Sequence, residues 1–322
     1  MSESLASVGI IGLGLIGGSL LRALSRPATD RRPGRVVGFD ESGDTRAAAR
    51  RAGFQVADSP DELVDCDLLV LAVPLPALDG LLPRLAGFRG LLTDVTSVKQ
   101  PVERLVRRHC PSVRFVGGHP MTGRASSGFS AGDGDLFTDR VWVLCLETET
   151  DISDVLAVGE LVCGLGGRLV PSTAAEHDAA AARISHVPHV AAGALTLLAA
   201  DPLSRTMAAG SFTDGTRVAA SRPDLVTAMC VGNAGPVHEE LDRLIAALTT
   251  ARDRLSSSDD FRDWYAPAWR LRSGWPPAMD NAREIPVSKD DFLSLGREGG
   301  WIFDVDRLTA TVMARYPRAP VA

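Results

Sequence analysis

The stretch VGIIGLGLIGGSLLRAL, residues 8–24, decides the fold of this chain. Its centre, from Gly12 to Gly17, has the spacing G-x-G-x-x-G, which a chain with 31 glycines can also produce by chance. Here an apolar run precedes the glycines and a helix-forming segment follows them, as a dinucleotide-binding βαβ unit requires. The alternative is a strand-to-helix turn that binds nothing.

Each glycine of the turn has a separate physical role in this interpretation. Gly12 permits the tight turn, and Gly14 lets the backbone approach a pyrophosphate. Gly17 lets the helix pack closely against the strand. The N-terminus of the helix would then face the phosphate charge.

The next strand ends at Asp40, 23 residues after Gly17. A carboxylate there can accept hydrogen bonds from the adenosine ribose hydroxyls and would repel a 2′-phosphate, so the predicted cofactor is NAD rather than NADP. We also expect the cofactor to contact a set of residues in the turn and after two later strands: Leu15, Ile16, Val73, Pro74 and Thr96.

Short apolar runs alternate with helix-length segments from Val8 to about Pro171, which predicts strands covered on both faces. We expect an α/β fold, a doubly wound Rossmann-type parallel sheet followed by a mainly α-helical second domain. The predicted domains are residues 1–171 for the cofactor, a helical domain over residues 172–256, and a C-terminal extension, residues 257–322, packed on the helical domain.

The helical domain begins with Thr173-x-x-Glu176, a plausible capping box that opens an Ala- and Leu-rich helix to about Ala200. Further helices are predicted at 224–231 and 236–256. The extension has a weak pattern, with one short helix expected at 289–295.

Composition excludes several classes of protein. Lys and Arg total 34 against 40 Asp and Glu, a net charge of -6, and the basic residues are scattered, so no nucleic-acid partner is expected. No segment is typical of a membrane-spanning helix. The five cysteines form no C-x-x-C pair, which argues against a disulfide framework or a thiolate metal site and predicts a cytoplasmic location.

Two segments that follow strands carry candidate chemical groups. His119 lies where ligands bind in doubly wound sheets, and a neutral imidazole there could take a hydroxyl proton as the carbon loses hydride. The alternative is a hydrogen-bonded loop histidine. The hydroxyls of the segment from Asp94 to Lys99 could line the same crevice, although such a segment is often only a helix N-cap.

The predicted long helix carries an unusual polar cluster. Ser185 and His189 share one face, His177 lies on the same side, and Pro188 should kink the helix near Ile184. Metal binding is an alternative, but no set with strong ligand spacing accompanies the cluster, and no metal is predicted. Further along, Arg217 could hold a carboxylate bidentately or form a surface ion pair.

Together these segments resemble the prephenate and arogenate dehydrogenases of tyrosine biosynthesis. The matching pieces occur in the order of the family: Gly12 to Ser19, Asp94 to Lys99, Gly118 to Gly123, His177-Asp178 with Ser185 to His189, and Thr216 to Ser221. The resemblance implies an NAD-dependent oxidative decarboxylation, in which hydride leaves the ring carbinol carbon, carbon dioxide departs and the ring becomes aromatic.

The resemblance also implies roles for individual residues. His119 would hydrogen-bond the ring hydroxyl with support from Ser97, and His189 and Arg217 would hold substrate carboxylates. Other residues would line the nicotinamide and substrate pocket: Thr122, His177, Ser185 and His186. The substrate would be prephenate, giving 4-hydroxyphenylpyruvate, or arogenate, giving tyrosine, and the helical domain would form a homodimer.

Two other functions stay open on the sequence alone. A β-hydroxyacid-type dehydrogenase would share both domains, but it usually relies on a lysine on the long helix, and residues 173–200 contain none. A non-catalytic NAD-binding regulator would not need His119, Ser97 and Arg217 together.

Overall fold

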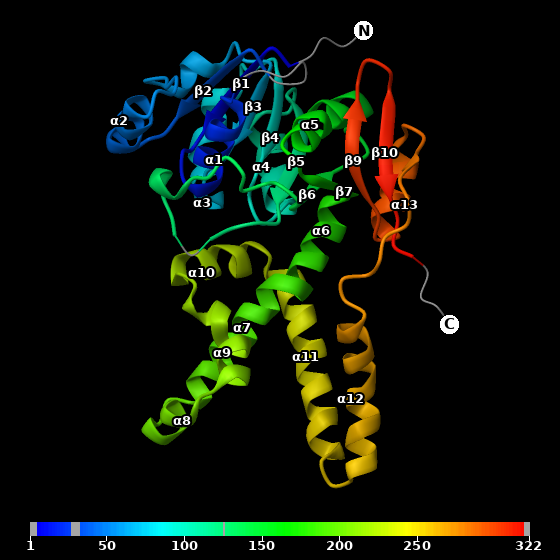
Figure 1. The fold of residues 1–322 in the computed structure, drawn as a ribbon. Helices are drawn as coiled ribbons and strands as arrows, with labels where there is room; N and C mark the ends of the chain where they lie inside the picture. Colours follow the sequence, from blue (N-terminus) through cyan, green and yellow to red (C-terminus); the bar gives the residue numbers. More distant parts are fainter. Residues whose placement is uncertain (1–4, 27–32, 125, 319–322) are drawn as a thin grey trace. The chain divides into compact units, whose positions relative to one another are not determined.

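The computed structural model describes residues 5–26, 33–124 and 126–318. The chain divides into two compact units (Figure 1). The first comprises residues 1–177 and 281–316, and the second comprises residues 178–280 and 317–322. The boundary therefore falls directly after His177, inside a helix.

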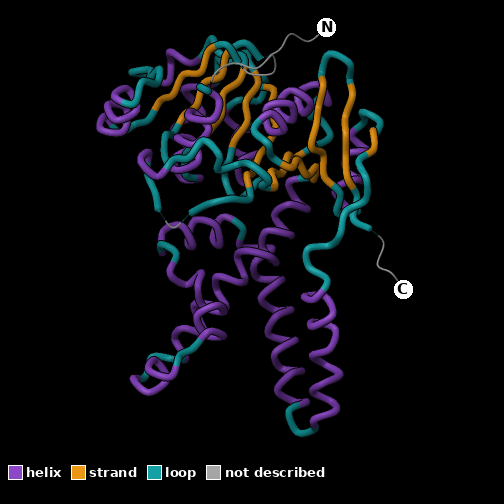
Figure 2. Tube along the Cα trace, viewed as in Figure 1, coloured by secondary structure: helices purple, strands orange, loops and turns teal. Residues whose placement is uncertain are grey.

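The first unit is built on one sheet in the order β2-β1-β3-β4-β5-β6-β7-β9-β10-β8 (Figure 2). Strands β1 to β5 are parallel, as predicted for a doubly wound fold. Strand β2 is added on one side of β1, and β3 and β4 are added on the other side. Doubly wound sheets bind ligands at such a switch point, which lies here between β1 and β3. The strands are β1 (Ser7–Ile11), β2 (Arg35–Phe39), β3 (Leu68–Leu71), β4 (Leu91–Asp94), β5 (Arg114–Pro120), β6 (Val141–Cys145), β7 (Arg168–Ser172), β8 (Arg283–Glu284), β9 (Trp301–Asp306) and β10 (Thr311–Arg315).

Helices cover both faces of the parallel part. Alternate residues such as Val8 and Ile10 point into one core, while Ile11 and Leu71 point into the other. Burial on both faces explains why the strands are apolar without a polar alternation. The helices of this unit are α1 (Leu15–Leu24), α2 (Gly43–Arg51), α3 (Leu75–Leu81), α4 (Gln100–His109), α5 (Ile152–Gly164), α13 (Lys289–Arg297) and the first part of α6 (Ala174–Ala181).

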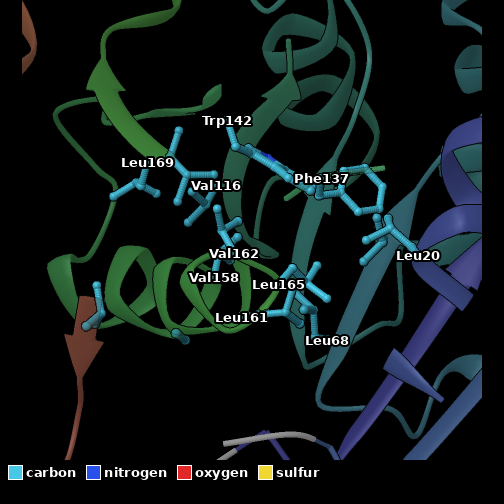
Figure 3. Packing of buried hydrophobic residues seen from close by; sticks show 14 of the residues in the cluster. Leu20, Leu68, Val116, Phe137, Trp142, Val158, Leu161, Val162, Leu165 and Leu169 are labelled. Carbon is cyan, nitrogen blue, oxygen red and sulfur yellow. The ribbon is translucent and has the colours of Figure 1, made fainter. Parts of the chain in front are cut away.

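Helix α5 shows how this packing arises from the sequence. Val158, Leu161, Val162 and Leu165 recur at helical spacing, so they form one apolar stripe. Figure 3 shows this stripe directed at strand side chains that include Val116. The stripe fixes α5 against the sheet.

The sheet is not wholly parallel, and the C-terminal extension does not all pack on the helical domain. Strand β6 runs antiparallel to β5, and β9 antiparallel to β7. Residues 281–316 thereby belong to the first unit, and of the extension only α12 (Ser258–Ser273) packs on helix α11 (Ala234–Arg254). A Cβ on Gly296 would lie 1.9 Å from the carbonyl oxygen of Pro171, so α13 lies against the end of β7. The short helix expected at 289–295 is α13.

The second unit is helical, as predicted. Its helices are the end of α6, α7 (Val187–Leu198), α8 (Pro202–Met207), α9 (Gly210–Thr216), α10 (Pro223–Gly232), α11 (Ala234–Arg254) and α12. The predicted kink before Pro188 takes the form of a π-helical turn, η4 (Ala182–His186). Proline cannot donate to the carbonyl of Ile184, so the wider turn accommodates the missing bond. No helix among the described residues is long and apolar enough to cross a membrane.

Candidate active site

The glycine turn after β1 has the geometry that the sequence predicts. Gly12 has φ +95°, and a Cβ there would lie 2.4 Å from the carbonyl oxygen of Ala72 and 2.9 Å from Cγ1 of Val73. A Cβ on Gly17 would lie 1.8 Å from the carbonyl oxygen of Gly12. By contrast, no described atom lies within 4 Å of a Cβ built on Gly14. Two glycines therefore serve close packing, and Gly14 leaves open space beside the backbone.

Helix α1 begins at this open space. Its N-cap, Gly14, makes no side-chain capping bond, and its first turn carries no acidic residue. The N–H groups of that turn, which includes Leu15 and Ile16, are therefore suited to an anion, and the helix dipole adds to the attraction. This observation fits a pyrophosphate, because a side chain at Gly14 would fill the space it needs.

Asp40 follows β2 and is tied to the same turn. Its Oδ2 accepts the N–H of Leu13 at 2.7 Å, and its Oδ1 accepts the N–H of Ser42 at 2.9 Å. The two bonds hold the carboxylate, which is half-buried, beside the glycine turn. Each carboxylate oxygen has a second lone-pair site, which a ribose hydroxyl can use.

A buried ion pair lies at the ends of β4 and β5. Lys99 Nζ donates to Asp94 Oδ2, and the two side chains are 1% and 0% exposed. The same two side chains hold the backbone of Gly118: its N–H donates to Asp94 Oδ1 at 3.1 Å, and its carbonyl oxygen accepts from Lys99 Nζ. We call this arrangement the Asp94–Lys99 clamp. The β4–β5 ladder ends at the pair of Thr93 and Val116. Beyond that pair the clamp joins the ends of the two strands, just before His119.

The clamp also shapes the turn that carries Ser97. The Thr96 hydroxyl donates to Asp94 Oδ2 and lies 2.9 Å from the carbonyl oxygen of Val98, and the Thr96 N–H donates to Asp94 Oδ2 at 3.0 Å. Thr96 is thus buried in the clamp, while Ser97 is half-buried. The interpretation of this segment as a mere N-cap is wrong, because helix α4 has no side-chain cap bond at Lys99.

His119 lies within β5 rather than in the loop after it, and it pairs in register with Val143 of β6. Its ring Nδ1 lies 2.9 Å from Nε2 of His177. The ring centroids are 5.1 Å apart with the planes at 71°. His119 is half-buried, whereas His177, on α6, is 4% exposed. The two histidines, 58 residues apart, thus form one hydrogen-bonded pair. Thr122 lies just beyond, half-buried, with its hydroxyl 3.4 Å from the carbonyl oxygen of Leu136.

In the second unit two contacts orient the ring of His189. Nδ1 lies 2.8 Å from the carbonyl oxygen of Ser185, so it must donate. Nε2 lies 3.3 Å from the hydroxyl of Ser221. Ser221 directly follows η5 (Arg217–Ala220), which packs beside α7. The Arg217 side chain is exposed and forms no ion pair within the described part of the chain.

His186 differs from its neighbours. It is 1% exposed, and its Nδ1 lies 3.2 Å from Nδ2 of Asn233. The same Asn233 amide donates to the carbonyl oxygen of Asp178 at 2.7 Å. The ring of His186 thus contacts Asn233 within the second unit, and its place in a substrate pocket stays a prediction.

Several of these partners could not be predicted from the sequence. Asn233 and Ser221 contact the histidines from distant helix ends. Only the proximity of Ser221 to Arg217, in a segment of small residues, hinted at a role. Lys99 and Asp94 were visible in the sequence, but their partner is a glycine backbone, which has no side chain to signal the contact. Within the described residues, no group of three His, Cys, Asp or Glu side chains could hold a metal ion.

The glycine turn, the carboxylate after β2 and the histidine at the end of β5 define an NAD-dependent dehydrogenase, and the comparisons with known proteins agree. Residues 28–171 match the prephenate dehydrogenase nucleotide-binding domain, and residues 173–264 match the prephenate dehydrogenase dimerization domain. The chain therefore belongs to the prephenate dehydrogenase family.

Individual relatives match over most of the chain. Prephenate dehydrogenase from Bacillus subtilis is 30% identical, over 96% of this chain and 86% of that protein. Cyclohexadienyl dehydrogenase from Zymomonas mobilis is 33% identical, over 78% and 89%. A crystal structure from Corynebacterium glutamicum superposes with a TM-score of 0.77 at 37% identity, covering 85% of this chain and 91% of that one. The family excludes the β-hydroxyacid-type dehydrogenase and the non-catalytic regulator.

The clamp predicts a large effect from one substitution. Lys99→Met removes the cation and leaves the Asp94 carboxylate buried without it. We expect the unfolding free energy, measured by urea denaturation, to fall by about 3–5 kcal/mol, the range for breaking a buried ion pair. The control is Arg84→Met, because Arg84 pairs with Asp61 at 2.9 Å on the surface and exposed pairs contribute little. Equally small losses in the two variants would contradict the clamp.

Proposed function

We propose that this protein catalyses the NAD-dependent oxidative decarboxylation of prephenate to 4-hydroxyphenylpyruvate. The observation that carries the proposal is the half-buried His119 imidazole at the end of β5, hydrogen-bonded through Nδ1 to a buried histidine. In this arrangement the second ring nitrogen, Nε2, is the candidate base for a substrate hydroxyl. The family assignment supplies the class of substrate, a cyclohexadienol carboxylate.

The proposed chemistry needs no covalent bond between the protein and the substrate. NAD, held at the glycine turn, would supply the acceptor for the hydride that leaves the ring carbon carrying the hydroxyl. His119 takes the hydroxyl proton, and Ser97 helps to hold that hydroxyl. The ring carboxylate then leaves as carbon dioxide, the ring becomes aromatic, and the proton returns to the phenolate oxygen. Aromatisation drives the last step, so positioning and proton transfer are what the side chains must supply.

The substrate is an anion with two carboxylates, and the second unit offers the donors for it. We propose that Arg217 and His189 contribute to binding these carboxylates. Arg217 has no ion pair among the described residues that would need to break first. Its guanidinium can bind a carboxylate bidentately. Ser185, whose backbone carbonyl orients His189, is half-buried beside it and is included in this proposed set.

Turnover with defined substrates tests the proposal directly. The purified protein is incubated with NAD and either prephenate or arogenate, and NADH formation is followed by absorbance. We expect turnover with prephenate, and the ratio of kcat/KM values decides between the two substrates. A higher kcat/KM for arogenate would make the protein an arogenate dehydrogenase. No turnover with either compound would reject the function.

Arg217→Ala tests carboxylate binding. We expect the KM for prephenate to rise by about tenfold or more, since hydrogen bonds to charged groups contribute about 1.5–3 kcal/mol. The expected change in kcat is smaller. The control is Arg205→Ala, which removes another exposed arginine of the second unit. An unchanged KM in Arg217→Ala would count against this role.

We further propose a homodimer formed through the second unit. The matched family domain is described as a dimerization domain. Apolar side chains of this unit are exposed in the single chain, among them Leu198 at 81% and Trp269 at 62%. Such residues are typical of surfaces that bury against a partner. Sedimentation should show a dimer, and an active monomer would overturn the proposal.

A cytoplasmic location is proposed as well. None of the five cysteines, all of which the structure describes, forms a disulfide, and three of them are buried. Cysteines without disulfides suit a reducing compartment. Recovery of the protein in an oxidising compartment after cell fractionation would contradict this location.

A further inference from the structure

We propose that His177 is a positioning residue for His119. As a hydrogen-bond acceptor it holds His119 in the tautomer in which Nδ1 is protonated and Nε2 is not. The inference rests on the proposed function and deepens it. It also replaces the expectation that His177 lines the substrate pocket. Its ring is only 4% exposed, and its Nε2 faces the Nδ1 of His119 at 2.9 Å.

Proton counting narrows the arrangement to two possibilities. A hydrogen bond between two ring nitrogens needs one proton between them, and a neutral imidazole carries only one N–H. If His177 donated, Nδ1 of a neutral His119 would be bare and its Nε2 protonated, so that Nε2 could not take a proton from a hydroxyl. If His119 donates, its Nε2 is bare and can act as the base. Only the second arrangement fits the proposed chemistry.

Charge favours a histidine as the acceptor. When His119 takes the substrate proton it becomes cationic, and an acceptor at Nδ1 stabilises that cation. His177 must stay neutral to accept, since two imidazolium rings 2.9 Å apart would repel each other strongly. Unlike a carboxylate, a neutral imidazole adds no negative charge that would favour the protonated form of His119 before it takes the substrate proton. The pair therefore suits a base that must begin its work neutral.

The helix that carries His177 is fixed at its start by several contacts. The Thr173 N–H donates to Glu176 at 3.1 Å and the Glu176 N–H donates to the Thr173 hydroxyl at 3.2 Å, which confirms the predicted capping box. Glu147 accepts the N–H of Ala174 at 2.6 Å. The His177 N–H donates to the carbonyl oxygen of Thr173 at 2.9 Å. A ring on so constrained a turn can set the orientation of another ring.

His119 is constrained from the other side. The clamp holds Gly118, the residue before it, by both backbone polar groups. The ladder with β6 holds His119 itself opposite Val143. Both histidines belong to the first unit, so their relation does not depend on the placement of the second.

Two substitutions of His177 separate hydrogen bonding from packing. Leucine fills the space but cannot accept a hydrogen bond, whereas the glutamine side-chain oxygen can accept near the position of Nε2. We expect His177→Leu to lower kcat for prephenate by about 10- to 100-fold, less than the loss of the base itself in His119→Asn. The KM should change less than threefold. His177→Gln should recover most of kcat. Equal losses in both variants, or none in the leucine variant, would overturn the proposal.

Nitrogen NMR of protein labelled with 15N-histidine tests the tautomer without turnover. The His119 signals are assigned by their absence in His119→Asn. We expect a protonated Nδ1 and a bare Nε2 in the unaltered protein, and a shift toward the other tautomer in His177→Leu. A protonated Nε2 in the unaltered protein would overturn the proposal even if the enzyme is active. Failure of all turnover would instead reject the function and leave the NMR result to decide the role of His177.

Discussion

The buried pair of Lys99 and Asp94 is the constraint on which the rest of the site depends. Two charges without solvent exposure are costly unless every polar atom around them is satisfied. Here the surplus donors and acceptors are satisfied by the Thr96 hydroxyl and by the backbone of Gly118. The pair can therefore exist only if the turn after β4 and the end of β5 take this one arrangement. The need to neutralise the charges thus fixes where Ser97 and His119 lie.

Gly118 meets this constraint because it has no side chain. A Cβ there would lie 2.7 Å from the carbonyl oxygen of Asp94 and 3.1 Å from Nε1 of Trp142. The close approach lets both backbone groups of Gly118 reach the two charged side chains. In the cofactor turn, Gly12 and Gly17 serve the same purpose, while the Asp40 carboxylate caps the N–H of Leu13. In the cofactor turn and in the Asp94–Lys99 clamp alike, a carboxylate accepts a backbone N–H and thereby fixes a loop at the carboxyl ends of the strands.

Sequence reasoning succeeded where the signal is local and failed where the contact is distant. The parallel strands, the glycine turn, Asp40 and the Thr173 capping box all follow from residues close together in the chain, so periodicity and spacing predict them. Pro188 predicted a distortion, but not that a π-turn would bury His186 against Asn233. The clamp joins residues about 20 positions apart through a glycine backbone, and the His119–His177 pair spans 58 positions. Helical periodicity could place His177 on a face, but not show which ring it meets.

Residues 281–316 have the weakest sequence pattern in the first unit. They act on the site indirectly, through a residue at the start of the helix that carries His177. Charged residues interrupt the apolar alternation of β9, and only Ile302 and Val305 face the core fully, so the strand has no clear signature. Cations also lie over aromatic rings of this strand, such as Arg168 of β7 over Trp301 at 5.0 Å. From this segment Arg297 reaches Glu176 at 2.7 Å. Although burial opposes it, the hydrogen bonds from Arg297 and Thr173 hold the pKa of Glu176 below its ordinary value. Glu176 therefore stays ionised as the capping residue of the helix that carries His177. The ion pair thus connects α13 to the hydrogen-bonded pair of His177 and His119.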